Sequence, residues 1–216
     1  PRLDAAIKVN GQAEFGIDAK VPGMVYASIE MCPVIGGTVK SIDDSAVLKQ
    51  PGVIGVYKIS NGGGVADGAV AVVADTYWHA YNARKKGLKV QWDDGAGSSL
   101  STAGMWAAIK AADKEIKPIK IRPDVGDAAG AIAGAAKVVK ASYTTPLMAH
   151  QPLEPMNMIA NVTGDKCELI GPTQFQQGAQ GTAAAVLGMK PENITVRTTY
   201  LGGGFGRRIE LDFISQ

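Results

Sequence analysis

The sequence predicts an α+β fold in two regions, and three observations support this. Apolar segments with strand-like patterns alternate with segments that begin at helix-capping residues. A stretch rich in Gly, Ser and Ala, from about residue 96 to residue 137, interrupts the alternation. A glycine-rich turn follows the last expected strand. We therefore expect an α/β region over residues 1–95, a linker over residues 96–137 and an α+β region over residues 138–216.

The first region is expected to contain strands and two helices. The strands are predicted at residues 23–31, 37–42, 53–59, 70–74 and 88–92. Asp44 is placed to begin a short helix that ends at Lys49. Asp75 or Thr76 is placed to cap a second helix that runs to about Lys86. The residues expected to face its core are Trp78, Ala80, Tyr81 and Leu88.

The linker and the second region are also expected to contain helices and strands. Ser101 is expected to cap a helix that contains Met105, Trp106 and Ile109, and residues 124–136 form a weaker Ala/Gly segment. In the second region, strands are predicted at residues 138–144, 156–162, 166–170 and 193–200. The second and third of these form a hairpin. Helices are predicted over residues 176–187, ended by Gly188, and from Ile209 to at least Ile214.

Composition excludes several classes of protein. The 216 residues are 46% hydrophobic and 19% charged, as in an ordinary globular protein, and the net charge of +2 does not indicate a nucleic-acid partner. No apolar run reaches the length of a membrane span. Cys32 and Cys167 lie far apart, so no disulfide framework, zinc site or iron–sulfur site is indicated. The absence of an initiator Met and the abrupt last helix predict that the chain is a piece of a longer polypeptide.

The glycine-rich turn carries the strongest chemical signal. It reads Leu201-Gly202-Gly203-Gly204-Phe205-Gly206-Arg207-Arg208. Its glycines permit positive φ angles and a close approach of the backbone to a ligand. Because a strand precedes it and a helix start follows it, its free N–H groups are expected to face an anion. A plain surface loop is the alternative, since a short glycine motif alone is weak evidence.

Four motifs in order and spacing resemble the molybdopterin-binding subunit of the xanthine dehydrogenase and aldehyde oxidase family. They are His150-Gln151-Pro152-Leu153-Glu154-Pro155, Gly171-Pro172-Thr173-Gln174, Leu187-Gly188-Met189 with Asn193-Ile194-Thr195-Val196, and Gly202-Gly203-Gly204-Phe205-Gly206. The first region is similar to the hammerhead α/β domain of that family. The phrase from Lys8 to Asp18 and the doubled arginine most resemble the isoquinoline 1-oxidoreductase beta-subunit group, which includes aldehyde dehydrogenases.

The resemblance implies a molybdenum hydroxylase. Such enzymes oxidise aldehydes or N-heterocycles with oxygen derived from water, and their cofactor is a molybdopterin with Mo, here taken as the cytosine dinucleotide. Electrons pass to 2Fe–2S clusters on an iron–sulfur partner subunit and, in exported members, to a cytochrome. Both periplasm and cytoplasm remain open as compartments. The remainder of the same subunit is a further expected partner.

The family's site residues map onto this chain residue by residue. Gln174 matches a glutamine whose amide donates to a molybdenum oxo ligand. The expected cofactor contacts are Gln174, Gly203, Gly204, Phe205, Gly206 and Arg207, with Arg208 as an alternative phosphate ligand. No residue is expected to bind the metal directly. The family's general base, a glutamate, is expected beyond Gln216, so this chain alone should be inactive.

Departures from the family pattern and competing hypotheses limit this interpretation. Purine-oxidising members carry a substrate-facing glutamate where this chain has Ile209, with Glu210 one position later, which argues against purines. His150 and Glu154 are expected to support the fold, because two prolines exclude a regular helix there. A structural or assembly module is the main alternative function. A nucleotide cradle ranks lower, because the chain lacks G-x-x-x-x-G-K-[S/T].

Overall fold

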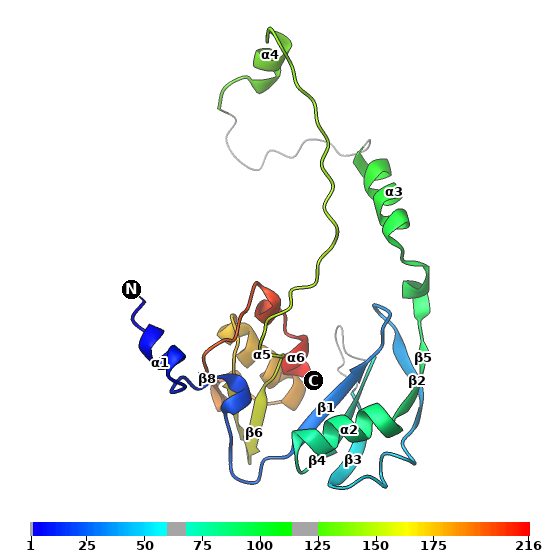
Figure 1. Cartoon of the computed structure of the whole chain (residues 1–216), viewed down its shortest axis with the longest axis vertical. Helices are drawn as coiled ribbons and strands as arrows, with labels where there is room; N and C mark the ends of the chain where they lie inside the picture. The colour runs from blue at the N-terminus through cyan, green and yellow to red at the C-terminus, as the bar shows by residue number, and fades with distance from the viewer. Residues whose placement is uncertain (1, 60–67, 114–124) are drawn as a thin grey trace. The chain divides into compact units, whose positions relative to one another are not determined.

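A computed structural model describes residues 2–59, 68–113 and 125–216 (Figure 1). Two compact units are present, one of Pro1–Ser98 with His150–Gln216 and one of Ser99–Ala149. The sheets of the described residues have the strand orders β1-β4-β3, β2-β5 and β6-β7-β8. Helices and strands are mixed in both sequence and space, which confirms the predicted α+β class.

The elements have the following bounds. The strands are β1 Tyr26–Met31, β2 Thr38–Asp43, β3 Val53–Ile59, β4 Ala69–Ala74, β5 Lys89–Asp93, β6 Ile159–Thr163, β7 Lys166–Gly171 and β8 Ile194–Thr198. The α-helices are α1 Ala5–Val9, α2 Tyr77–Gly87, α3 Thr102–Asp113, α4 Ala128–Ala133, α5 Gln176–Leu187 and α6 Asp212–Ser215. Short 3-10 helices are η1 Gly16–Asp18, η2 Gly95–Ser99, η3 Pro191–Asn193 and η4 Arg207–Ile209. None of the helices in the described ranges is long and apolar enough to cross a membrane.

Strand β4 is the centre of the first sheet. It pairs antiparallel with β1, from Tyr26 opposite Ala74 to Met31 opposite Ala69, and antiparallel with β3 on its other side. Helix α2 packs on β1 and β4 (Figure 1). Because neighbouring strands and a helix cover it, β4 is buried along almost its whole length, which explains its continuous apolar sequence.

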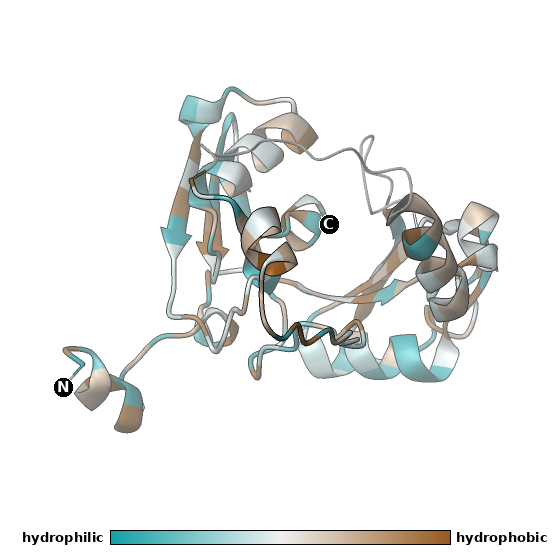
Figure 2. Cartoon of the chain, turned by 90° about the horizontal axis from the view of Figure 1, so that it is seen from above, coloured by the Kyte–Doolittle hydropathy of each residue, from teal (hydrophilic) through white to brown (hydrophobic). Residues whose placement is uncertain are grey.

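Helix α2 begins as predicted but presents a different face to the sheet. The Thr76 hydroxyl accepts a hydrogen bond from the backbone N–H of His79 at 3.2 Å, so Thr76 is the N-cap. Ala80 and Ala83 are buried, whereas Trp78 is 68% exposed, so the prediction that Trp78 faces the core is wrong. At about 100° per residue, Trp78 points away from the side that Ala80 and Ala83 share. The rest of the helix is mainly hydrophilic (Figure 2).

Removal of the α2 cap should lower stability measurably. Thr76→Ala leaves the His79 N–H without its acceptor, and we expect a loss of about 1 kcal/mol in the free energy of unfolding, measured by urea denaturation. Thr76→Ser keeps the hydroxyl and serves as the control. Equal stability of the alanine and serine variants would contradict the capping role.

Two predicted elements are wrong. Residues 45–49 form turns, and only Leu48 N–H reaches back to the Asp44 carbonyl, at 3.0 Å. The Asp43 carboxylate instead accepts hydrogen bonds from the Ser45 amide and hydroxyl, which favours a turn. Residues 138–144, all within the described part of the chain, are exposed and form no strand. Their apolar residues predict a strand, but no neighbouring strand pairs with them there.

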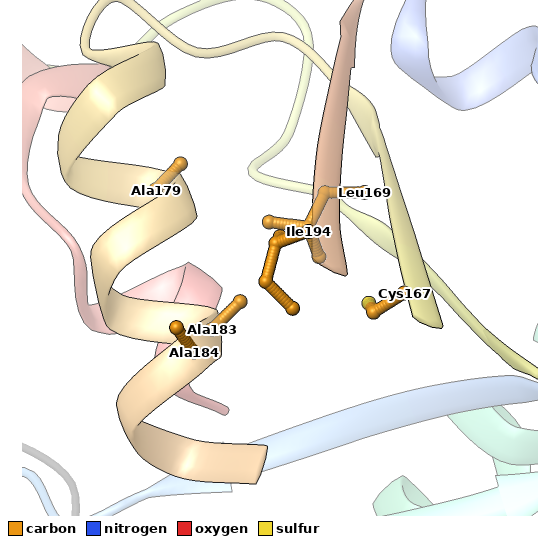
Figure 3. Close-up of a cluster of buried hydrophobic side chains, with 6 residues drawn as sticks. All are labelled: Cys167, Leu169, Ala179, Ala183, Ala184 and Ile194. Atoms are coloured by element: carbon orange, nitrogen blue, oxygen red, sulfur yellow. The ribbon is translucent and has the colours of Figure 1, made fainter. Parts of the chain in front are cut away.

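The third sheet combines a hairpin with a crossover. Strands β6 and β7 pair antiparallel around Thr163 and Lys166, which confirms the predicted hairpin. Strands β7 and β8 are parallel because α5 connects them. Small side chains of α5 face Cys167, Leu169 and Ile194 of the strands in one buried cluster (Figure 3). Gly188 ends α5 with φ of 63°, as predicted.

An N-terminal segment joins this third sheet. Phe15 forms a parallel bridge with Tyr200, and the Tyr200 N–H donates to the Glu14 carbonyl at 3.0 Å. The residues just before η1 therefore extend the sheet beyond the end of β8. The predicted final helix is also different: the chain forms the short helix η4 and then, after a break, α6.

Candidate functional site

Two loops meet at one edge of the third sheet. Pro172, Thr173 and Gln174 follow β7, and the turn Gly202–Gly206 follows β8 after a short connection. Since β7 and β8 are parallel, their carboxyl ends lie at the same edge, where α/β sheets commonly bind ligands. This topology brings two segments together that lie about thirty residues apart in the sequence.

Gln174 is hydrogen-bonded to the glycine turn. Its side-chain Oε1 accepts from the Gly206 N–H at 3.2 Å. A backbone N–H can only donate, so this contact orients the amide with its oxygen toward Gly206. Among the described residues, no acceptor is bonded to the Gln174 Nε2 group. The side chain is exposed, so this NH₂ group is free to donate to a ligand.

The backbone of the turn has an unusual conformation. Gly203 and Gly206 have φ of 99° and 88°, and Phe205, with φ of 52°, is the only non-glycine with positive φ in the described part of the chain. Gly203 and Gly206 thus adopt the positive φ angles that the glycine-rich sequence permits. Within the described residues, the N–H groups of Gly203, Gly204 and Phe205 have no hydrogen-bond acceptor. Such a run of open N–H groups is suited to anionic oxygens.

Arg207 is partly engaged within the protein. Its two terminal nitrogens donate to both carboxylate oxygens of Asp212, at 2.8 and 2.7 Å. These hydrogen bonds raise the pKa of Arg207 above its ordinary value. A phosphate contact by Arg207 would have to use the N–H groups that Asp212 leaves over.

Arg208 is completely buried. The sequence interpretation gives it only as an alternative phosphate ligand and does not predict its structural role. Its Nη2 donates to the Glu154 carboxylate at 2.9 Å, and its Nε donates to the Gly203 carbonyl at 2.8 Å. Burial lowers the pKa of Arg208, and the negative charge of Glu154 opposes that effect. Its Nη1 is buried without a protein partner. Arg208 therefore stabilises the turn from within.

The motif that contains His150 and Glu154 divides into two roles. His150 is exposed, whereas Glu154 is 7% exposed and paired with Arg208. Thr173, also buried, donates through its hydroxyl to the Arg208 carbonyl at 3.3 Å. Sequence reasoning could have found this network only by noticing that acidic and basic residues fall inside otherwise apolar or glycine-rich motifs.

The described residues hold no ready-made metal site. No group of three or more His, Cys, Asp or Glu side chains lies together among them. Cys167 is buried in the apolar cluster of the third sheet, and burial raises the pKa of its thiol.

Comparison with known proteins identifies the class of domain. Residues 110–214 match the molybdopterin cofactor-binding domain. The chain is 32% identical over 229 residues to isoquinoline 1-oxidoreductase subunit beta of Brevundimonas diminuta. This alignment covers 97% of this chain and 27% of that protein. It is 31% identical over 225 residues to a membrane-bound aldehyde dehydrogenase [pyrroloquinoline-quinone] of Gluconacetobacter polyoxogenes. This alignment covers 98% of this chain and 27% of that protein.

The fold agrees with this class. The crystal structure of quinoline 2-oxidoreductase from Pseudomonas putida 86 superposes with a TM-score of 0.70 at 20% identity, over 96% of this chain and 30% of that one. The chain is similar to molybdopterin-binding subunits of the xanthine dehydrogenase and aldehyde oxidase family, as its motifs predicted. It spans about a quarter of the length of the curated relatives named above (27%).

Proposed function

We propose that the full-length protein is a molybdopterin-dependent oxidoreductase that oxidises aldehydes or N-heterocycles with oxygen derived from water. The observation that carries this proposal is the pairing of Gln174 with the turn. One amide atom of Gln174 is fixed by Gly206, the other is free to donate, and open N–H groups lie in the same turn. This donor set fits the oxygens of an oxo ligand and of an anionic cofactor.

The proposed roles of the individual residues follow from their hydrogen-bonding capacity. When bound, the molybdopterin cofactor supplies the oxidation chemistry, and the protein supplies its orientation. Gln174 Nε2 would donate to an oxo ligand, and the N–H groups of Gly203, Gly204 and Phe205 would donate to neighbouring oxygens. The Phe205 ring, 72% exposed, would border the space for substrate. Gly206 would keep Gln174 in place, and Arg207 would contact cofactor phosphate through its remaining N–H groups.

The side chain at position 209, close to the turn, supports the proposed substrate class. Ile209, half-exposed, occupies the position where purine-oxidising members carry a glutamate, so no carboxylate is available there to bind a purine. An apolar side chain favours an aldehyde or a simple N-heterocycle. We further propose the cytosine dinucleotide form of the cofactor and 2Fe–2S clusters on a partner subunit.

The domain division belongs to the same proposal. Residues 1–95 would be a hammerhead-like domain, residues 96–137 a linker, and residues 138–216 part of the cofactor-binding domain. The general base would lie outside residues 1–216. The remainder of the subunit would then complete the site, with an iron–sulfur subunit as the electron acceptor.

Metal analysis of the full-length subunit tests the proposal. We expect close to one molybdenum per chain, together with turnover of an aromatic aldehyde or of isoquinoline with an artificial electron acceptor. Pyrroloquinoline quinone in place of molybdenum would overturn the proposal, and it is worth assaying because one relative carries that cofactor in its name. A protein with neither cofactor and no turnover would instead be an assembly module.

The 216-residue chain by itself should be inactive. Because the proposed general base lies outside it, we expect no tight binding of molybdenum cofactor and no oxidation of aldehyde or N-heterocycle by the purified chain. The measurement is molybdenum content and dye reduction, with the full-length subunit as the positive control. Turnover by the purified chain alone would contradict this expectation.

A further inference from the structure

Glu154 is a buried carboxylate whose two oxygens accept hydrogen bonds from three parts of the chain. Oε1 accepts from the Ile17 N–H and from Asn157 Nδ2, both at 3.1 Å. Oε2 accepts from the Gly202 N–H and from Arg208 Nη2, both at 2.9 Å. A carboxylate offers about four lone-pair positions, so Glu154 is fully used by these four donors. One side chain therefore holds Ile17 and Gly202, which lie 137 and 48 positions away from it in the sequence.

Glu154 and Gly202 exchange two hydrogen bonds and approach each other closely. The Glu154 N–H donates to the Gly202 carbonyl at 3.0 Å, while the Glu154 carboxylate accepts from the Gly202 N–H. A Cβ added at Gly202 would lie 2.3 Å from the Glu154 Cβ, so only glycine permits this approach. The start of the turn is thus fixed on both of its backbone groups by one residue.

The end of the turn is fixed through Arg208. Besides its ion pair with Glu154, Arg208 Nη2 donates to the Glu154 carbonyl at 2.9 Å. The Arg208 carbonyl in turn accepts from the Gln174 N–H at 3.1 Å. A continuous path of hydrogen bonds therefore leads from Glu154 through Arg208 to the backbone of Gln174. A shift of Glu154 would change the placement of Gln174 relative to the turn.

We infer that Glu154 is a positioning residue for the cofactor site, which acts through Gly202 and Arg208 without touching the cofactor. This inference rests on the proposed function, because it assumes that the turn and Gln174 bind the cofactor. Glu154 holds the open N–H groups of the turn at a fixed distance from the Gln174 amide. The Ile17 N–H bonds to the same carboxylate, so the N-terminal segment at η1 is part of this support.

Glu154→Gln in the full-length subunit tests the inference. Glutamine keeps the size and shape of the glutamate side chain. Its NH₂ group replaces one carboxylate oxygen, so the two donors that bind that oxygen lose their acceptor. We expect less molybdenum per chain, and a kcat per bound molybdenum lower by about tenfold to a hundredfold, since displacements of ~1 Å have effects of this size. Glu168→Gln is the matched control, because Glu168 also lies near an arginine, Arg197, but outside the turn. It should match the wild type in both measurements.

A second variant separates positioning from folding. Glu154→Gln leaves the buried charge of Arg208 uncompensated, so Glu154→Gln combined with Arg208→Gln removes both charges. We expect this double variant to regain part of the melting temperature that Glu154→Gln loses, because the buried charge is gone, but not the kcat per molybdenum of the wild type. Wild-type kcat per molybdenum in both variants would overturn the inference, and so would failure of both to fold. Absence of molybdenum from the wild type would instead refute the proposed function.

Discussion

Replacement of Gly206 by valine in the full-length subunit is expected to remove most of its molybdenum. Gly206 has φ of 88°, a conformation in which a β-branched residue is a genuine outlier. The strain, of the order of 1–3 kcal/mol, favours a different backbone path through the turn. The Gly206 N–H would then leave Gln174 Oε1, and the open N–H groups of the turn would be displaced from the Gln174 amide.

Gly204→Val should produce the same loss for a different reason. A Cβ at Gly204 would lie 2.6 Å from Gln174 Oε1 and 2.8 Å from Gln174 Cδ, so the added side chain displaces the glutamine. The two variants therefore test one site through backbone strain and through steric collision.

The control for Gly206→Val is Gly188→Val. Gly188 also has positive φ, 63°, with no atom within 4 Å of an added Cβ, but it ends α5. This control should suffer comparable strain and keep its molybdenum. Strands β1, β3 and β4 should remain protected in hydrogen exchange in all three variants. Normal molybdenum content in both Gly204→Val and Gly206→Val would reject the turn as a cofactor contact.

Elements set by local chemistry could be predicted from the sequence. Thr76 caps α2 and Gly188 ends α5 because each satisfies backbone groups within a few residues of itself. The hairpin of β6 and β7 is local in the same sense. Residues 138–144 failed as a predicted strand, because a strand depends on a partner whose position the local sequence does not state.

The candidate site shows the same division. The motifs predict Gln174 and the glycine turn as cofactor contacts, and in the structure the Gly206 N–H donates to Gln174 Oε1. The sequence predicts that Glu154 supports the fold but does not predict its partners, because Ile17 and Gly202 arrive from distant positions. The sequence predicts Arg208 only as an alternative to Arg207 for binding phosphate, because burial of an arginine cannot be read from a glycine-rich motif.

Gln174→Ala in the full-length subunit should lower turnover by roughly one to three orders of magnitude, the usual effect of losing one electrostatic donor at a reacting centre. Expression and melting temperature should hardly change, because the side chain is exposed and such substitutions are usually within about 0.5 kcal/mol. Gln177→Ala, at a neighbouring exposed glutamine of α5, is the control and should retain full turnover.

Gln174→Glu isolates the role of the amide NH₂ group. A glutamate still accepts from the Gly206 N–H, so the contact that orients the side chain survives, but the donor is replaced by a negatively charged acceptor. Electrostatic repulsion of an oxo ligand then adds to the loss of the hydrogen bond. We therefore expect turnover per bound molybdenum to fall at least as far as in Gln174→Ala. Full activity of the glutamate variant would show that Gln174 serves the turn only as an acceptor, and its assignment as a donor to the metal centre would be withdrawn.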